Sequence, residues 1–175
     1  GQAGTDGVMP AVWPAGSTVV LIDRSVVQIP FRAADRGLSR RWRIGAAGRG
    51  VDDPAVAERA AAFDGVGLRP YAPAHLRWQR VGGEDRFTWI RRSRLPEADS
   101  WTGEEVPLGE AAERYRVRVI AGGAILRLAD VTAPGWTYPA ALRAADGVAG
   151  ASRVEVAQVS DRFGAGPFAG IDLDG

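Results

Sequence analysis

Apolar and polar residues alternate in the second half of this 175-residue chain. Tyr115, Val117 and Val119 are separated by arginines, so an extended backbone would bury one set of side chains and leave the other in water. Val154 and Val156 flank a glutamate in the same way. The pattern predicts an antiparallel two-sheet sandwich over residues 73 to 173, with these side chains inside: Trp89, Tyr115, Val117, Val119, Val154 and Val156.

Tight turns separate the β-prone segments of this region. Gly82-Gly83 and Gly122-Gly123 are typical turn sequences. Short strands joined by regular turns are typical of a β-sandwich. The segments that we expect to form strands are residues 76–81, 87–92, 115–120, 124–128, 136–138 and 153–159.

The first 72 residues show a weaker pattern. After an extended arm, residues 17–22 and 26–31 are apolar and β-branched on either side of a turn, which predicts a hairpin. Residues 42–44 form a further strand candidate. Asp53-Pro54 before an alanine-rich stretch gives the start signals of a helix over residues 55–62, but the β-rich surroundings equally allow an extended stretch, and both interpretations stay open.

Glycines and prolines between residues 64 and 76 mark a boundary, because the residue before each proline is driven towards extended conformations. We therefore expect a smaller β-rich segment over residues 1–72 and a sandwich over residues 73–175. The first segment buries too little to offset an ordering entropy of roughly 1 to 2 kcal/mol per residue. We therefore expect this segment to dock on the sandwich, or to pair with strands from another part of a longer polypeptide or from a neighbouring subunit.

The charge balance of the chain limits the kinds of partner that it can bind. All 22 basic residues are arginine, they face 21 carboxylates, and the net charge is +1. Such a chain has no global field to attract nucleic acid, so we expect no nucleic-acid partner. One local arginine cluster surrounds Trp42, and it favours an inter-subunit ion-pair surface over a solvated face or a polyanion site. Its members are Arg32, Arg36, Arg40, Arg41, Arg43 and Arg49.

The candidate chemistry is sparse. His75 is the only histidine and cysteine is absent, so neither a catalytic triad nor a thiolate or histidine zinc site can be assembled from the usual residues. The carboxylates between residues 97 and 110 favour a solvated loop over a catalytic pair, and the glycine-rich stretch 45–50 lacks the Lys-Ser/Thr end of a phosphate-binding loop. The longest aliphatic run, Val19 to Ile22, is too short for a membrane span. We expect no enzyme, no cofactor and no metal.

Three features together resemble a fibronectin type III domain: Trp89 on an early strand, the strand Tyr115-x-Val117-x-Val119, and the glycine-rich exit Gly164-Ala-Gly-Pro167. The resemblance covers residues 73 to 173 and implies a seven-stranded sandwich. The chain departs from this family at Ser152, where the family's corner tyrosine is expected, and at Gln158, where a small apolar residue is expected. A long acidic connection containing Trp101 is the third departure.

A second resemblance extends over most of the chain. Its blocks look like the C-terminal part of the large baseplate or tail-tip proteins of gene transfer agents and related tailed phages. The blocks are residues 38–44, 67–76, 89–94, 99–110 and 156–168.

This second resemblance implies a non-enzymatic structural component of a tail baseplate, in a virion or gene transfer agent particle assembled in the bacterial cytoplasm. The expected partners are other baseplate or tail subunits and copies of the chain itself, as a trimer, with a host-envelope glycan or receptor as a further partner. A hydrolase-like barrel would lie upstream. The alternative is a carbohydrate-binding accessory module that directs an upstream hydrolase to cell-envelope glycans.

Loops at the end of a rigid sandwich commonly carry binding residues. Two loops have unusual chemistry here: the acidic stretch 96–107 with Trp101, and the stretch 160–167, which presents Arg162 and Phe163. In fibronectin topology these loops lie at the same end, so we expect a joint interaction site with Trp101 and Phe163 as apolar anchors and Arg162 as the polar one. An equal alternative is that Trp101 folds back over the sandwich. Trp42 lies outside the sandwich and is a further candidate for contacts between domains or subunits.

Overall fold

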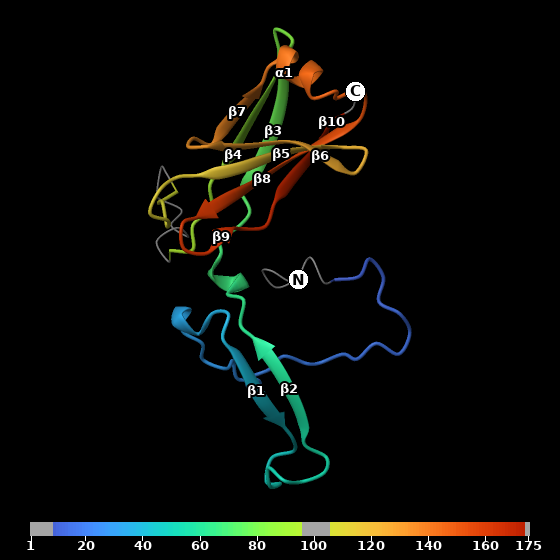
Figure 1. Ribbon diagram of the computed structural model, residues 1–175, viewed down its shortest axis with the longest axis vertical. Helices are drawn as coiled ribbons and strands as arrows, with labels where there is room; N and C mark the ends of the chain where they lie inside the picture. Colours follow the sequence, from blue (N-terminus) through green and yellow to red (C-terminus); the bar gives the residue numbers. More distant parts are fainter. Residues whose placement is uncertain (1–8, 96–105, 174–175) are drawn as a thin grey trace. The chain divides into compact units, whose positions relative to one another are not determined.

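The computed structural model describes residues 9–95 and 106–173. The chain divides into two compact units, Gly1–Val66 and Gly67–Gly175. Each unit has its own strands (Figure 1).

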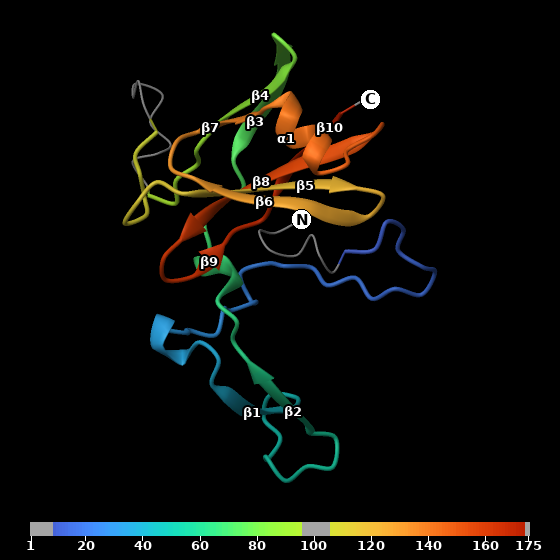
Figure 2. The ribbon, with the colours of Figure 1, turned by 45° about the horizontal axis from the view of Figure 1, so that its top comes forward.

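The second unit is a β-sandwich of antiparallel strands (Figures 1 and 2). One sheet has the order β3-β4-β7, and the other has the order β10-β8-β5-β6 with short β9 pairing on β8. The first, second and fifth strands thus share one sheet, which is the fibronectin type III arrangement expected from the sequence. The bounds are β3 Ala74–Val81, β4 Glu84–Ile90, β5 Tyr115–Ala121, β6 Ala124–Val131, β7 Gly135–Tyr138, β8 Ser152–Ser160, β9 Gly164–Ala165 and β10 Ala169–Leu173.

The predicted core is confirmed. All six side chains expected inside are buried, and the arginines between the β5 valines lie on the other face. Residues from both sheets build this core because strand alternation presents one side chain in two to the opposite sheet. The remaining large buried side chains are Phe87, Tyr138 and Leu173.

Two of the three departures from the fibronectin pattern, Gln158 and Ser152, have structural compensations, and Trp101 of the third lies outside the described residues. Gln158 is 2% exposed, and its Oε1 accepts a hydrogen bond of 3.4 Å from the Arg92 backbone N–H. Ser152 begins β8 without a corner tyrosine. Instead, the connection from β7 to β8 contains a short helix, α1 Ala140–Ala145, and the Tyr138 hydroxyl donates to Asp146 directly after it.

The first unit contains one antiparallel pair, β1 Ser39–Ile44 with β2 Ala57–Ala62, a 3-10 turn at Ala33–Asp35, and a second at Val66–Leu68. The extended alternative for residues 57–62 is therefore the correct one. Helix start signals at Asp53 serve a turn instead: its side chain accepts a hydrogen bond from the Ala55 N–H. Cross-strand pairing with β1 overrides the helix propensity of the alanines.

The prediction of a hairpin over residues 17–31 is wrong, because its two strands do not form. The turn at its centre is present, since the Val26 N–H donates to the Asp23 carbonyl at 3.1 Å. The flanking segments belong to no strand. A two-stranded ribbon is marginal unless one face is buried, and these segments have no covered face in this unit.

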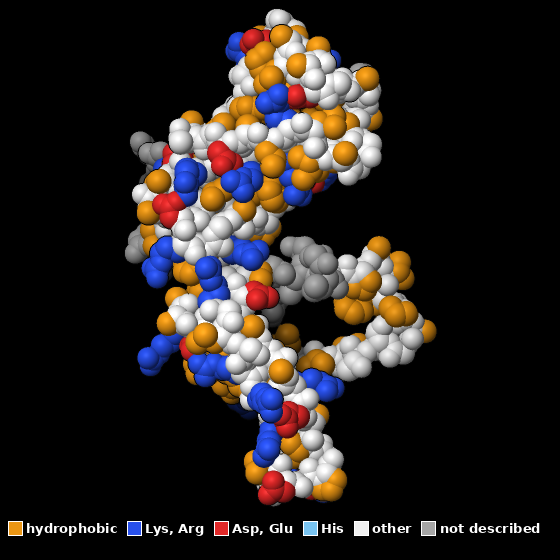
Figure 3. All heavy atoms as spheres, viewed as in Figure 1, with side chains coloured by type: hydrophobic (Ala, Val, Ile, Leu, Met, Phe, Trp, Pro, Cys, Tyr) orange, Lys and Arg blue, Asp and Glu red, His pale blue; other side chains and the backbone are white. Residues whose placement is uncertain are grey.

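Burial in the first unit is slight. Among residues 9–66 only Gly65 is buried, and the largest apolar contact joins Phe31, Phe63 and Trp42, with the two phenylalanine rings stacked at 4.9 Å. Figure 3 shows hydrophobic side chains exposed on this unit. The exposed set along the arm is Val12, Trp13, Val19, Val20, Leu21, Ile22, Val26, Val27 and Ile29.

The boundary lies a few residues before the predicted one. Residues 67–72 belong to the sandwich unit, where Pro70 is buried and the Leu68 carbonyl accepts a hydrogen bond from Arg94. Tyr71 lies beneath the Arg92 guanidinium, with 4.9 Å between Cζ and the ring centroid. The glycines and prolines therefore mark a packed lead-in to β3 rather than a free linker.

Candidate interaction site

The two connections singled out in the sequence lie at the same end of the sandwich. Their described parts enclose a hollow of about 250 Å³. Arg94 and Glu110, from the connection between β4 and β5, face residues 160–163 from the end of β8 across it. Residues 96–105 of the first predicted loop lie outside the described residues, so the joint site expected with Trp101 stays a prediction.

Phe163 is half-buried between two guanidinium groups. The Cζ atoms of Arg94 and Arg162 lie 5.9 and 5.4 Å from its ring centroid, within the range of cation–π attraction. Arg94 Nη2 also donates to Glu110 Oε1 at 2.6 Å. The ring is therefore held in place, while Arg162 is exposed to solvent at the rim.

Ion pairing fixes this end of the sandwich further. Arg114 pairs with Asp161, and Arg91 pairs with Glu113 at 3.3 Å. The Tyr115 hydroxyl donates to the same Glu113 carboxylate at 2.7 Å, and burial together with this bond raises the Tyr115 pKa above its usual value. The described part of this end is thus a mixed-charge surface linked by ion pairs. Trp101, the third predicted anchor, lies outside the described residues.

Trp42 lies on β1 and is half-buried. Its ring meets Phe31 edge to face with 5.7 Å between centroids. Together with Ile29, Ile44 and Phe63 it lines an open apolar hollow of about 420 Å³. Three of the six arginines around Trp42 pair with carboxylates of the same unit: Arg40 with Asp35, Arg41 with Glu58, and Arg49 with Asp53.

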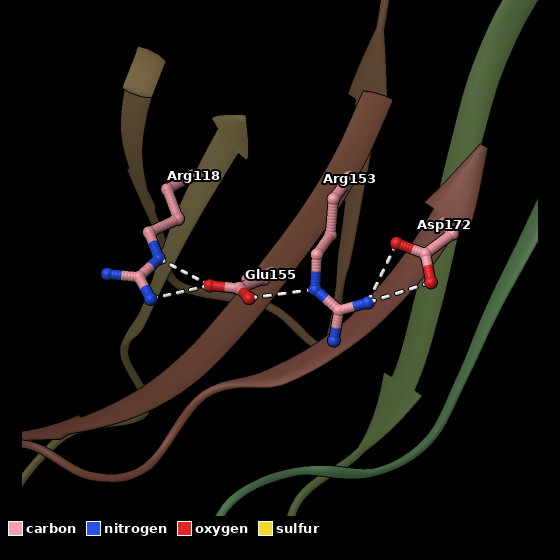
Figure 4. Close-up of polar contacts among 4 residues, drawn as sticks. All are labelled: Arg118, Arg153, Glu155 and Asp172. Atoms are coloured by element: carbon pink, nitrogen blue, oxygen red, sulfur yellow. Dashed lines mark hydrogen bonds and ion pairs between the residues drawn. The ribbon is translucent and has the colours of Figure 1, made fainter. Parts of the chain in front are cut away.

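Sequence reasoning missed an ion-pair ladder across the outer face of the four-stranded sheet. Figure 4 shows Glu155 between Arg118 and Arg153, and Arg153 in turn on Asp172. The nitrogen–oxygen distances along this chain are 2.5, 2.9 and 2.8 Å. A second pair, Arg116 with Asp130, uses two parallel hydrogen bonds of 2.8 Å each.

Charge is balanced in this ladder. Burial raises the pKa of Glu155, but the hydrogen bonds from Arg153 and Arg118 outweigh it, so the pKa lies below its usual value. The signal in the sequence was the alternation itself, since a glutamate between Val154 and Val156 must share a face with the β5 arginines. The ladder ties β5, β8 and β10 together, the Arg116–Asp130 pair adds β6, and the paired charges leave little for an ionic partner.

A second cluster missed from the sequence surrounds Asp85 on β4. Its side chain is fully buried and accepts hydrogen bonds from Trp78 Nε1 at 3.0 Å, Arg80 Nε at 2.8 Å and Arg143. Burial raises the pKa of Asp85, but these three donors lower it by more, so the carboxylate stays charged. The cluster joins β3, β4 and α1 beside a partly open hollow of about 180 Å³.

The remaining candidate residues from the sequence are His75 and the side chains that could bind a metal ion. His75 is exposed on β3 and has a φ of 53°, which marks the β-bulge between Ala74 and Arg77. Among residues 9–95 and 106–173, no group of three or more histidine, aspartate or glutamate side chains could hold a metal ion. Within the same residues, no helix is long and apolar enough to cross a membrane.

No protein-family model matches the chain, and no curated protein does. Among solved structures, the chain is similar to domains d3-d4 of the rat CD45 extracellular region, with 9% identity over 95% of this chain and 80% of that one, at a TM-score of 0.42. It is also similar to the Clostridium perfringens spore cortex lytic enzyme SleM, with 11% identity over 77% of this chain and 38% of that one, at a TM-score of 0.39. Likenesses this weak carry no functional argument, and the fold is assigned from strand order.

Proposed function

We propose that the chain is a non-enzymatic structural segment of a phage-like tail baseplate or tail tip, where it contributes to particle assembly and to attachment at the host surface. The proposal starts from the blocks of sequence that resemble gene transfer agent and phage baseplate proteins. The chain would then be part of a particle that is assembled in the bacterial cytoplasm, where it contacts other tail subunits and copies of itself.

One structural observation supports an assembly role above others. The first unit carries most of the exposed large aliphatic side chains among the described residues, yet almost nothing in it is buried. Monomeric soluble proteins seldom leave such contiguous apolar surface uncovered, and larger exposed patches mark interaction sites. A segment of a larger assembly would cover this surface with its neighbours.

Localisation in purified particles tests the assembly role. An epitope tag inserted between Gly122 and Gly123, in the β5–β6 turn, lies at an exposed site of the sandwich. Gold-labelled antibody is expected at the tail tip of particles, with untagged particles as the control. Particles of normal composition that lack the chain would contradict the proposal.

A double replacement tests the attachment role at the sandwich end. We expect Trp101→Ala with Phe163→Ala in the full-length protein to leave the melting temperature nearly unchanged and to abolish assembly or host attachment. Tyr71→Ala, on the lead-in to β3, is the matched aromatic control. A large loss of stability with normal attachment by the surviving folded protein would refute this site. Binding to a glycan array that is lost with Trp101→Ala would instead favour the carbohydrate-binding alternative.

A further inference from the structure

None of the described strands pairs with the outer edge of β6. In the sheet order β10-β8-β5-β6, β6 is terminal and pairs only with β5 among the described strands. It is eight residues long, Ala124–Val131. A strand of this length with an open edge presents a row of backbone donors and acceptors that can template another strand.

The β6 edge has one irregularity, because its register with β5 skips Leu126 between the pairs Val119–Arg127 and Ile120–Ile125, but the strand is eight residues long and contains no proline. The other sheet edges of the sandwich are blocked by a bulge, by prolines or by short length. β3 is interrupted by the bulge at His75, which disturbs the spacing of its backbone groups. β7 has four residues and is flanked by Pro134 and Pro139. β10 has five residues and lies beside β3. Bulges, prolines and short length are the usual means of blocking edge-to-edge pairing.

The side chains of β6 favour a partner rather than repel one. Ile125, Leu126 and Leu128 are 50%, 36% and 59% exposed. The only two charges on the strand are already engaged, Arg127 with Asp146 and Asp130 with Arg116. No lysine or proline occurs on this edge.

A matching strand exists elsewhere in the chain. Residues 17–22 read Ser-Thr-Val-Val-Leu-Ile, without charge, glycine or proline. Their aliphatic side chains are 66% to 91% exposed, and the segment belongs to no strand. β-branched residues with apolar side chains on both faces are typical of a strand that is covered on both sides. The sequence therefore fits a strand inside a sheet, and no sheet of its own unit contains it.

We infer that residues 17–22 of one copy add to the outer edge of β6 of a second copy, as a further strand of that sheet. A second copy is taken as the donor, and donation within one chain is the alternative that the cross-linking below separates from it.

Such a contact joins different surfaces of the two copies. Reciprocal exchange gives a dimer, and repeated head-to-tail addition closes a ring. The interface does not depend on the baseplate role, so it can stand or fail independently of the proposed function.

Cysteine cross-linking tests the contact directly, because the natural chain has no cysteine. Two differently tagged full-length chains, one with Val20→Cys and the other with Leu128→Cys, are co-expressed and treated with a short bismaleimide. We expect a mixed dimer carrying both tags. The matched control replaces the second chain by Gln79→Cys on β3, which should give little mixed dimer.

Three outcomes of the cross-linking experiment overturn the inference. These are the absence of mixed dimer with Leu128→Cys, equal yield with Gln79→Cys, and purely intramolecular linkage in a chain that carries both Val20→Cys and Leu128→Cys. Sedimentation adds an independent measurement. Leu128→Lys should abolish the wild-type oligomer, because addition of the strand would bury the ammonium group, while Val81→Lys on β3 should leave it intact. A wild-type chain that stays monomeric at all concentrations, or an oligomer that survives Leu128→Lys, also refutes it.

Discussion

The Tyr138 hydroxyl donates a 2.5 Å hydrogen bond to Asp146 Oδ2. Tyr138 ends β7, Asp146 follows α1, and Arg127 of β6 donates two hydrogen bonds to the same carboxylate. This contact fastens the connection between β7 and β8, the region where a fibronectin-type sandwich has its tyrosine corner. Ser152 lacks that hydroxyphenyl group, and Tyr138 supplies a different one from the preceding strand.

Removing the Tyr138 hydroxyl should weaken the sandwich. Tyr138→Phe keeps the buried ring but deprives the Asp146 carboxylate of one donor, and we expect a loss of about 1 to 2 kcal/mol in the free energy of unfolding. Urea denaturation of the full chain measures it. Tyr71→Phe is the control, and its effect should be smaller. Equal effects of the two substitutions would argue against an anchoring role for Tyr138.

Asp85 should make stability depend on pH in the acid range. Folding lowers its pKa below the ordinary value of 3.8, so its contribution is fully present above that value and is lost as pH falls through the folded-state pKa. We expect Asp85→Asn to cost about 3 kcal/mol at neutral pH, because two arginines lose their buried partner. The variant should also lose part of the acid-induced fall in stability seen in the wild-type chain.

Thermal melts from pH 7 down to pH 2 measure both effects. Asp52→Asn, which changes an exposed carboxylate in the first unit, is the control and should reproduce the wild-type curve. A parallel displacement of the Asp85→Asn curve at every pH would show that Asp85 contributes no proton linkage.

The sandwich could be predicted because its signal is local. Alternation at Tyr115, Val117 and Val119 determines which face is buried, and the glycine pairs fix the turns. β10 was missed since Ala169–Leu173 contains a glycine and an aspartate, which are rare in strands, and it is stabilised by pairing with β8 instead.

The clusters around Asp85 and Glu155 could not be predicted as contacts, because their partners lie up to 58 residues away and depend on strand register. In the arm, by contrast, the sequence predicted strands that the structure does not have. Residues 17–22 have strand-forming composition, and composition alone cannot say which edge they would pair with. The contacts of Arg94 and Arg162 with the Phe163 ring could not be predicted from the sequence either.

The two units should differ in autonomy. A chain of residues 67–175 should melt cooperatively, since it contains the whole buried cluster. A chain of residues 1–66 should show no cooperative transition, because a two-stranded ribbon without a covered face is marginal in water. Calorimetry of the two separate chains checks this. A sharp monomeric transition in residues 1–66 would contradict the interpretation that this unit needs a partner surface.

Gly166 should tolerate no side chain, whereas Gly164 should tolerate one at modest cost. A methyl group at Gly166 would collide with the Pro70 carbonyl oxygen and lie 3.0 Å from the carbonyl carbon, both fixed backbone atoms. The Gly166 N–H also donates to the Gln158 carbonyl at 3.0 Å, so the glycine cannot move away without breaking a backbone hydrogen bond. Because overpacking a tight site commonly costs 1 to 3 kcal/mol, we expect a loss of about 3 kcal/mol for Gly166→Ala.

Gly164 has a φ of 78° and open space around it, so Gly164→Ala should lose only about 1 kcal/mol through backbone strain. Gly67→Ala, with open space and no positive φ, is the neutral control. Urea denaturation of the three variants should therefore rank them Gly166, Gly164 and Gly67 in decreasing loss. A Gly166→Ala protein as stable as Gly67→Ala would show that residues 67–72 do not pack against the exit from β9.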